Sequence, residues 1–263
     1  MSEFLKTIQK TMQEWQNKGA CCGAIQLNEF IGQDYFDTCN PHFYTGNLKS
    51  KLVMIQLNPK REIKDFNLKS TKSIESYMDF YSNYGKHVYG AASGQRFKSK
   101  FDQKLIRFLK PLNLLEINTT DIFQNLENVV DQKLQVEFIP FGSPNFDYTL
   151  IPQHRLDYYM EIILDLITSE TRECVIFGGR VFSELLTPYT IGKEIHRFKL
   201  QKVNGDWTKN DYEIEQIALN FNGKIFQAYI APQFAQQGMP VEAYGKQLAK
   251  IMAVNNFQLK FNS

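Results

Sequence analysis

The sequence predicts an α/β protein, a three-layer sandwich in which helices flank a central, mainly parallel sheet of four strands. Two observations lead to this prediction. Short apolar runs alternate along the chain with longer amphipathic segments, an order that favours parallel strands joined by helices. Several of these runs also stop at Asn, Gly or Pro, the residue types that favour turns.

The size of the chain fits one large domain. It has 263 residues and 43% hydrophobic content, enough to bury a sizeable core. No internal repeat or low-complexity linker divides it. We therefore expect a single domain over residues 1–263, with a helical and loop-rich N-terminal extension over about residues 1–50.

The composition also bounds location and cofactors. No apolar run approaches the roughly 20 residues of a membrane span, and the start MSEFLKTIQK lacks the apolar centre of a signal peptide. We expect a cytoplasmic protein without a membrane partner. The four cysteines are too few and too unevenly spaced for a disulfide framework. Cys39 and His42 lack the second pair that a zinc site needs, so no metal and no other cofactor is expected.

The N-terminal segment is typical of an amphipathic helix. Residues 2–18 place apolar side chains on one helical face, Ser2 is available as an N-cap, and Gly19 stands where the helix would end. Residues 20–50 have weak periodicity and many turn formers. They predict a loop-rich approach to the first central strand.

The first central strand is the apolar start of LVMIQLNPK, residues 52–60. Pro59 cannot donate a ladder hydrogen bond and favours extended geometry at Asn58, so the strand stops there. The Asn58 amide is then presented at the carboxyl end of the strand, where open α/β sheets bind ligands. An ordinary turn that only ends the strand is the alternative.

The same patterns predict the remaining elements. Further strands are expected at 112–117 (ending at Asn118), 174–177 (followed by Gly178-Gly179) and 225–230 (ending near Pro232). Helices are expected at 97–109, 152–168, directly after Gly179, and from Pro240 onward. Residues 138–146 suggest a turn-rich loop, and residues 198–220 an antiparallel pair around Asn204-Gly205.

Positive charge is concentrated in one part of the chain. Residues 60–110 hold twelve Lys or Arg against five Asp or Glu, an excess of seven charges in a chain of net charge +2. Aromatic residues are interleaved with the basic ones over residues 60–95. This composition suits a substrate-facing insertion that stacks bases and contacts phosphates. A solvated Lys-rich helix face with aromatic core residues is the alternative.

The four predicted strand ends, taken in order, resemble the uracil-DNA glycosylase superfamily. They are Asn58-Pro59, Asn118, Gly178-Gly179 and Ala231-Pro232-Gln233, and the likeness covers about residues 50–253. The resemblance implies a four-stranded parallel sheet between helices. In the mismatch-specific and single-strand-selective branches of that superfamily the first strand ends in a motif of the G-x-N-P-G kind. The second strand of the family delivers an Asn to the base, and the last ends in a loop of the H-P-S kind.

The sequence departs from those motifs at four positions. Gln56 and Lys60 replace the two motif glycines, and Ala231 and Gln233 replace the loop His and Ser. Plain uracil is therefore not the expected base. A larger or modified pyrimidine suits the altered pocket better, and the superfamily includes bacterial antiviral members that excise modified bases from phage DNA.

The resemblance implies roles for individual residues. Asn58 would orient the attacking water, which makes it the predicted catalytic residue, because the Asp used by other branches is absent. Phe234 and Met239 would wedge into DNA, with core packing as the alternative for both. The expected base- and substrate-binding residues are Gln56, Leu57, Pro59, Lys60, Phe66, Asn118 and Gln233.

The predicted function is a DNA glycosylase that flips a modified or damaged pyrimidine and hydrolyses its N-glycosidic bond, leaving an abasic site. Defence against phage with modified cytosines is the expected context. DNA is the predicted partner, and no obligate protein partner is inferred. Two alternatives stay open: a non-catalytic nucleic-acid-binding relative, and a hydrolase or transferase that acts on free nucleotides.

Overall fold

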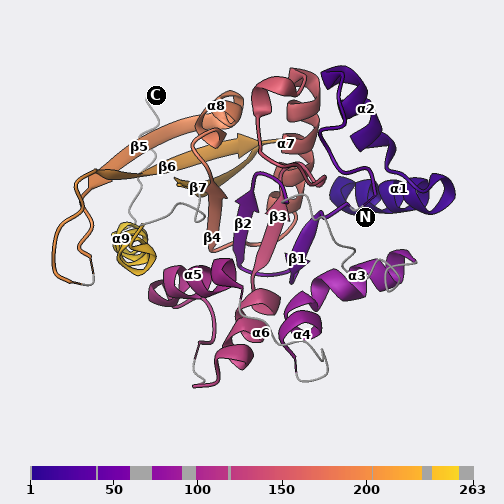
Figure 1. Cartoon of the computed structure of the whole chain (residues 1–263). Helices are drawn as coiled ribbons and strands as arrows, with labels where there is room; N and C mark the ends of the chain where they lie inside the picture. Colours follow the sequence, from indigo (N-terminus) through magenta and orange to yellow (C-terminus); the bar gives the residue numbers. More distant parts are fainter. Residues whose placement is uncertain are drawn as a thin grey trace.

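The structure is a computed structural model, and it describes residues 2–39, 41–59, 73–90, 99–117, 120–202, 204–232 and 239–254. Figure 1 shows a single sheet with helices packed on either side of it. The chain is therefore an α/β protein.

The sheet is mixed and has seven strands in the described residues, in the order β1-β3-β2-β4-β7-β6-β5. Strands β3, β2, β4 and β7 run parallel to one another in its centre. Strand β1 pairs antiparallel with β3. On the other side of the sheet β6 pairs antiparallel with β7, and β5 pairs antiparallel with β6. The bounds are β1 (Tyr44–Gly46), β2 (Leu52–Gln56), β3 (Leu134–Glu137), β4 (Cys174–Gly178), β5 (Thr190–Phe198), β6 (Tyr212–Phe221) and β7 (Lys224–Ala231).

The prediction of four strands is therefore wrong in number. The three additional strands are all antiparallel, and two of them carry the alternating polar side chains of a sheet that meets water. Strand β5, whose side chains are half-buried or exposed along its whole length, is the clearest case. A search for continuous apolar runs does not detect such strands.

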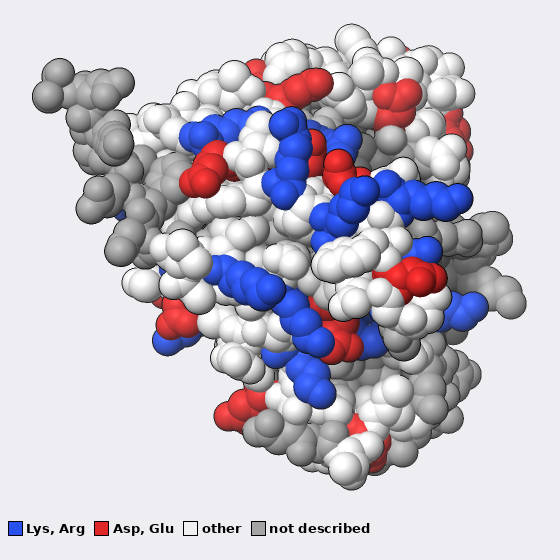
Figure 2. All heavy atoms as spheres, turned by 90° about the vertical axis from the view of Figure 1, so that its left-hand side faces the viewer, with Lys and Arg blue, Asp and Glu red and all other residues white. Residues whose placement is uncertain are grey.

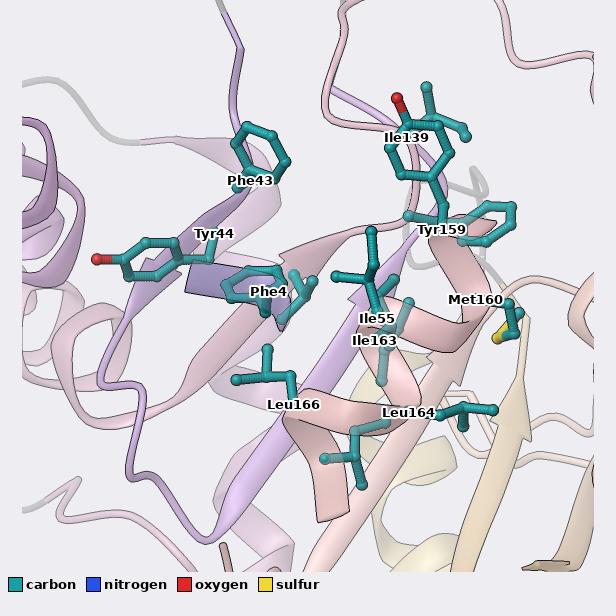
Figure 3. Packing of buried hydrophobic residues seen from close by; sticks show 14 of the residues in the cluster. Phe4, Phe43, Tyr44, Ile55, Ile139, Tyr159, Met160, Ile163, Leu164 and Leu166 are labelled. Atoms are coloured by element: carbon teal, nitrogen blue, oxygen red, sulfur yellow. The ribbon is translucent and has the colours of Figure 1, made fainter. Parts of the chain in front are cut away.

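One face of the sheet packs against α1 (Glu3–Lys18), α2 (Cys22–Ile31) and α7 (Gln153–Thr168). Val53 and Ile55 of β2 belong to this cluster, and Figure 3 shows Ile55 above Ile163 of α7. Helix α1 starts at the Ser2 cap and ends at Gly19, which adopts a left-handed φ of 71°. The N-terminal helix predicted over residues 2–18 is confirmed.

The opposite face packs against α5 (Lys100–Leu109) and α9 (Val241–Ala253), with α6 (Ile122–Gln132) beside them. Leu52 and Met54 of β2 point to this side. Thus β2 supplies buried side chains to both faces, as expected for a central parallel strand. The remaining helices are α3 (Ile74–Ser82), α4 (Tyr84–Tyr89) and the short α8 (Phe182–Leu185), with 3-10 turns at Lys110–Leu112, Tyr148–Leu150 and Thr187–Tyr189.

The predicted strand over residues 112–117 is wrong. Leu112 closes a 3-10 turn, and Asn113 then adopts a left-handed conformation with φ of 54°, which no strand contains. The second parallel strand is β3 instead. Asn118 itself lies outside the described residues, but the segment that leads to it is not a strand of the sheet.

Residues 20–50 also differ from the prediction. They contain α2 and β1 rather than loops alone, since Ala24 and Leu27 bury one side of α2 against α1 and the sheet. The antiparallel pair expected within residues 198–220 exists, but its strands lie further apart in sequence, and Asn204-Gly205 falls in the connection between them. Among the described helices, none combines the length and apolar character needed to cross a bilayer.

Candidate functional site

The candidate site lies at the carboxyl ends of the parallel strands. Gln56 of β2 is in register with Glu137 of β3, and Gly178 of β4 is in register with Ala231 of β7, so these strands end at one edge. Ligands of open α/β sheets bind at this edge.

The amide of Asn58 is held in one orientation by two acceptors. Its Nδ2 donates to the carbonyl oxygen of Phe141 at 3.2 Å and to Oγ of Ser143 at 2.8 Å. A carbonyl can only accept, and the Ser143 hydroxyl donates to the carbonyl of Asn145, so the nitrogen must face both partners. None of the hydrogen bonds among the described residues goes to Oδ1 of this half-buried side chain.

Gln56 lies at this edge, and one of its hydrogen-bond donors has no partner among the described residues. The side chain is only 9% exposed, and its Nε2 has no hydrogen-bond partner among the described residues. It lies against Gly178, where an added Cβ would come within 2.9 Å of both Nε2 and Oε1. The glycine of β4 thus makes room for the amide, and the unpaired N–H is a donor that a bound group could use.

Beside Gln56, a buried chain of polar side chains follows β3. Lys133 Nζ donates to Gln135 Oε1 at 3.1 Å, and Gln135 Nε2 donates to Glu137 Oε1 at 2.9 Å. Leu134 and Val136 point to the opposite face, so this alternation puts the polar residues on the α5 and α9 side. Glu137 and Lys133 are 5% and 1% exposed.

Burial shifts the pKa values of these groups toward neutrality. It raises the pKa of Glu137 from 4.5 to about 7, although the hydrogen bond from Gln135 and the charge of Lys133 oppose this. Burial also lowers the pKa of Lys133 to about 8, against the attraction of nearby carboxylates. A carboxyl group that changes charge near neutral pH is suited to proton transfer.

A third titratable group, the half-buried His42, stands just before β1, the strand that pairs with β3. Burial and, to a smaller extent, the charge of Lys133 lower the pKa of His42 to about 4, so the ring is neutral at pH 7. The ring lies 4.8 Å from the ring of Tyr81, and its Nε2 has no partner among the described residues. We call His42, Gln56, Lys133, Gln135 and Glu137 the buried polar cluster.

The site residues predicted from the sequence differ in where they lie: some are beside Asn58, one packs in the core, and five are outside the described residues. Leu57 and Pro59 flank Asn58 and are half-buried: Leu57 packs on the α7 side, and the Pro59 carbonyl accepts from Ser143 N. Met239 is 8% exposed and packs into the core under α9, so this side chain does not project as a wedge. The other predicted residues, Lys60, Phe66, Asn118, Gln233 and Phe234, lie outside the described residues.

The sequence-based predictions missed Ser143, His42 and Glu137. Glu137 had one signal, a charged residue directly before the apolar pair Phe138-Ile139, because a buried carboxylate is costly unless it is paired. The signal was lost since the second strand was placed at residues 112–117. Ser143 and His42 had none, because their partners come from segments distant in the sequence.

The described residues contain no group of three or more His, Cys, Asp or Glu side chains arranged to hold a metal ion. The side chains of the buried polar cluster are amides, an ammonium, one carboxyl and one neutral imidazole. Such groups bind by hydrogen bonds, so an organic ligand with both donors and acceptors fits them best.

Comparisons with family models, with curated proteins and with solved structures find no match to this chain.

Proposed function

We propose that this chain is a DNA glycosylase that hydrolyses the N-glycosidic bond of a flipped pyrimidine, with Asn58 as the residue that orients the water. The observation that carries the proposal is the Asn58 amide at the carboxyl edge of the sheet, which Phe141 and Ser143 hold by its Nδ2 and whose Oδ1 accepts from none of the described residues. The parallel strands β3, β2, β4 and β7 between two helical layers support a three-layer, glycosylase-like arrangement.

Neutral amides and one carboxylate are side chains that can catalyse the hydrolysis of a glycosidic bond. The C1′–N bond breaks as its electron pair moves to the base, and the sugar becomes cationic before a water oxygen bonds to C1′. Asn58 Oδ1 would accept a hydrogen bond from that water and so orient it. Glu137, ionised above pH 7, would take up the proton that the water loses, and so would fill the place of the carboxylate that the sequence motif lacks.

The leaving base needs hydrogen-bond donors. Nε2 of Gln56, which has no partner among the described residues, is such a donor, and it is buried, where a hydrogen bond to a developing negative charge is strongest. The superfamily has glycine at the position of Gln56. The larger side chain here supports a modified base, rather than plain uracil, as the substrate. Excision of modified pyrimidines from phage DNA in the cytoplasm is the biological role that we propose.

The test is release of a base from defined oligonucleotides. Substrates carrying uracil, mismatched pyrimidines or phage-type modified cytosines are incubated with the protein, and abasic sites are detected by alkaline cleavage. We expect cleavage of at least one modified substrate. Asn58→Ala should lower its rate by about a hundredfold or more, and Glu137→Gln should also remove the rise in rate with pH near 7.

Asn17→Ala serves as the matched control, because Asn17 is an exposed amide on α1, far from the sheet edge. It should leave the rate unchanged. Circular dichroism of each variant checks that the fold is retained. Abasic sites on none of the substrates would overturn the proposal: DNA binding without release would then identify a non-catalytic binder, and cleavage of free nucleosides a nucleotide hydrolase.

A further inference from the structure

A basic groove lies between α5, α9 and the chain that connects β5 to β6. Its volume is about 820 Å³, within the range of ligand-binding clefts. The floor is apolar, since Leu200 and Val241 are buried there. The rim carries Lys104, Arg107, Lys202, Trp207, Lys246 and Lys250.

The charge of the groove is strongly unbalanced. Five of its lining residues are Lys or Arg, whereas Glu242 is its only acidic lining residue in the described part of the chain. Glu242 pairs with Lys246 at 2.9 Å, an exposed pair one helical turn apart. Figure 2 shows the face that carries these elements, on which Lys and Arg outnumber Asp and Glu. Such a groove attracts a polyanion.

Trp207 adds a surface for stacking. It stands in the connection between β5 and β6, forms an isolated bridge with Gln201, and is 62% exposed. Exposing an indole to water is unfavourable, and an aromatic ring beside several cations is the combination that binds unpaired bases and their phosphates. A duplex would keep its bases stacked inside and could not use this ring.

The groove is connected to the carboxyl edge of the sheet through the chain itself. Strand β7 ends at that edge with Ala231, and the chain then leads to Met239, which lines the groove at the start of α9. Residues of the first three turns of α9 continue along the groove. The groove therefore lies along the helix that follows β7 in the chain.

We propose that this groove binds a single-stranded segment of DNA, with its phosphates on Arg107, Lys202 and Lys250 and a base stacked on Trp207. The inference rests on the proposed function in taking DNA as the polymer and in placing the target base at the edge of the sheet. It adds that the substrate strand is unpaired beside the flipped base, which lowers the energy needed to extrude that base.

The test measures fluorescence anisotropy of a short labelled oligothymidylate across a series of KCl concentrations. The triple variant Arg107→Gln/Lys202→Gln/Lys250→Gln should bind about tenfold or more weakly, and the slope of log K against log salt should fall by about 2. Trp207→Ala should weaken binding about tenfold without changing that slope. An oligomer of abasic deoxyribose phosphate should bind equally to wild type and to Trp207→Ala.

The control variant Lys10→Gln/Lys49→Gln removes two exposed charges outside the groove. The inference would be overturned if this control weakened oligothymidylate binding as much as the triple variant does. Tighter binding of a blunt duplex, or no binding of oligothymidylate at all, would also overturn it. A different result would contradict the proposed function without contradicting this inference. If the groove variants lose binding as expected but wild type makes no abasic sites, the groove stands and the glycosylase proposal falls.

Discussion

The carboxyl group of Glu137 is buried and changes its charge near neutral pH. The free energy of unfolding should therefore depend on pH. Between pH 4.5 and 7 the folded protein retains a proton that the unfolded chain has released. The free energy of unfolding therefore falls as pH rises through this window. Above pH 7 both states are ionised, and the penalty stays constant.

Replacing this acid with a neutral isostere should remove that penalty. Relative to wild type, Glu137→Gln should gain roughly 2–3 kcal/mol of unfolding free energy between pH 4.5 and 7. The amide oxygen can still accept from Gln135, so the cluster keeps its geometry. Urea titrations at several pH values measure the difference. Glu29→Gln, at an exposed position on α2, should show no comparable trend, and a pH-independent gain in Glu137→Gln would contradict the buried position.

At the residue scale, sequence analysis could find Asn58 but not its setting. The Asn-Pro pair at the end of an apolar run marks the end of β2, and the structure has the strand there. The two acceptors that orient the amide come from a segment about eighty residues further along the chain. No local pattern connects such positions, so the direction in which Oδ1 points was beyond prediction.

At the scale of elements, the predicted strands at 52–57, 174–177 and 225–230 correspond to β2, β4 and β7. Strands β2 and β4 are buried along their whole length, and β7 is buried in its second half. Strand β3 was not predicted because it has only four residues and two of them, Gln135 and Glu137, are polar. The side chains of these two residues are hydrogen-bonded to each other. The run at 112–117 is more apolar, but short apolar runs do not distinguish a strand from a packed turn.

The crossing of α5 and α9 depends on one glycine. A Cβ added at Gly245 would lie 2.1 Å from the carbonyl oxygen of Phe108, which is backbone and cannot move aside. Gly245→Ala should therefore push the helices apart and lower the unfolding free energy by about 1–3 kcal/mol, despite the better helix propensity of Ala. Urea denaturation measures this.

The neighbouring substitution Lys246→Ala is the control for the same helix. Lys246 is exposed, and its ion pair with Glu242 contributes little in water, so the change should stay within about 0.5 kcal/mol. Equal stability of Gly245→Ala and wild type would mean that the two helices are not in close contact at Gly245.

At the scale of the whole molecule, the two hydrophobic clusters share the strands that separate them. In β2, Val53 and Ile55 enter one cluster while Leu52 and Met54 enter the other, and β4 alternates in the same way. Losing either helical layer would expose one face of these strands to water. Because apolar burial is the main favourable term in folding, the two layers should unfold together.

The two tryptophans allow this cooperativity to be measured. Trp207→Phe leaves Trp15 as the only tryptophan, and Trp15 lies on α1, packed against the cluster on the α7 side. The fluorescence of Trp15 then follows one layer, whereas far-UV circular dichroism follows all helices and strands. We expect both signals to give the same urea midpoint and the same slope, because Trp207 is exposed and its replacement leaves the core intact. A fluorescence transition at clearly lower urea would show that the N-terminal helices form a separate unit, and the expectation of one domain over residues 1–263 would then be wrong.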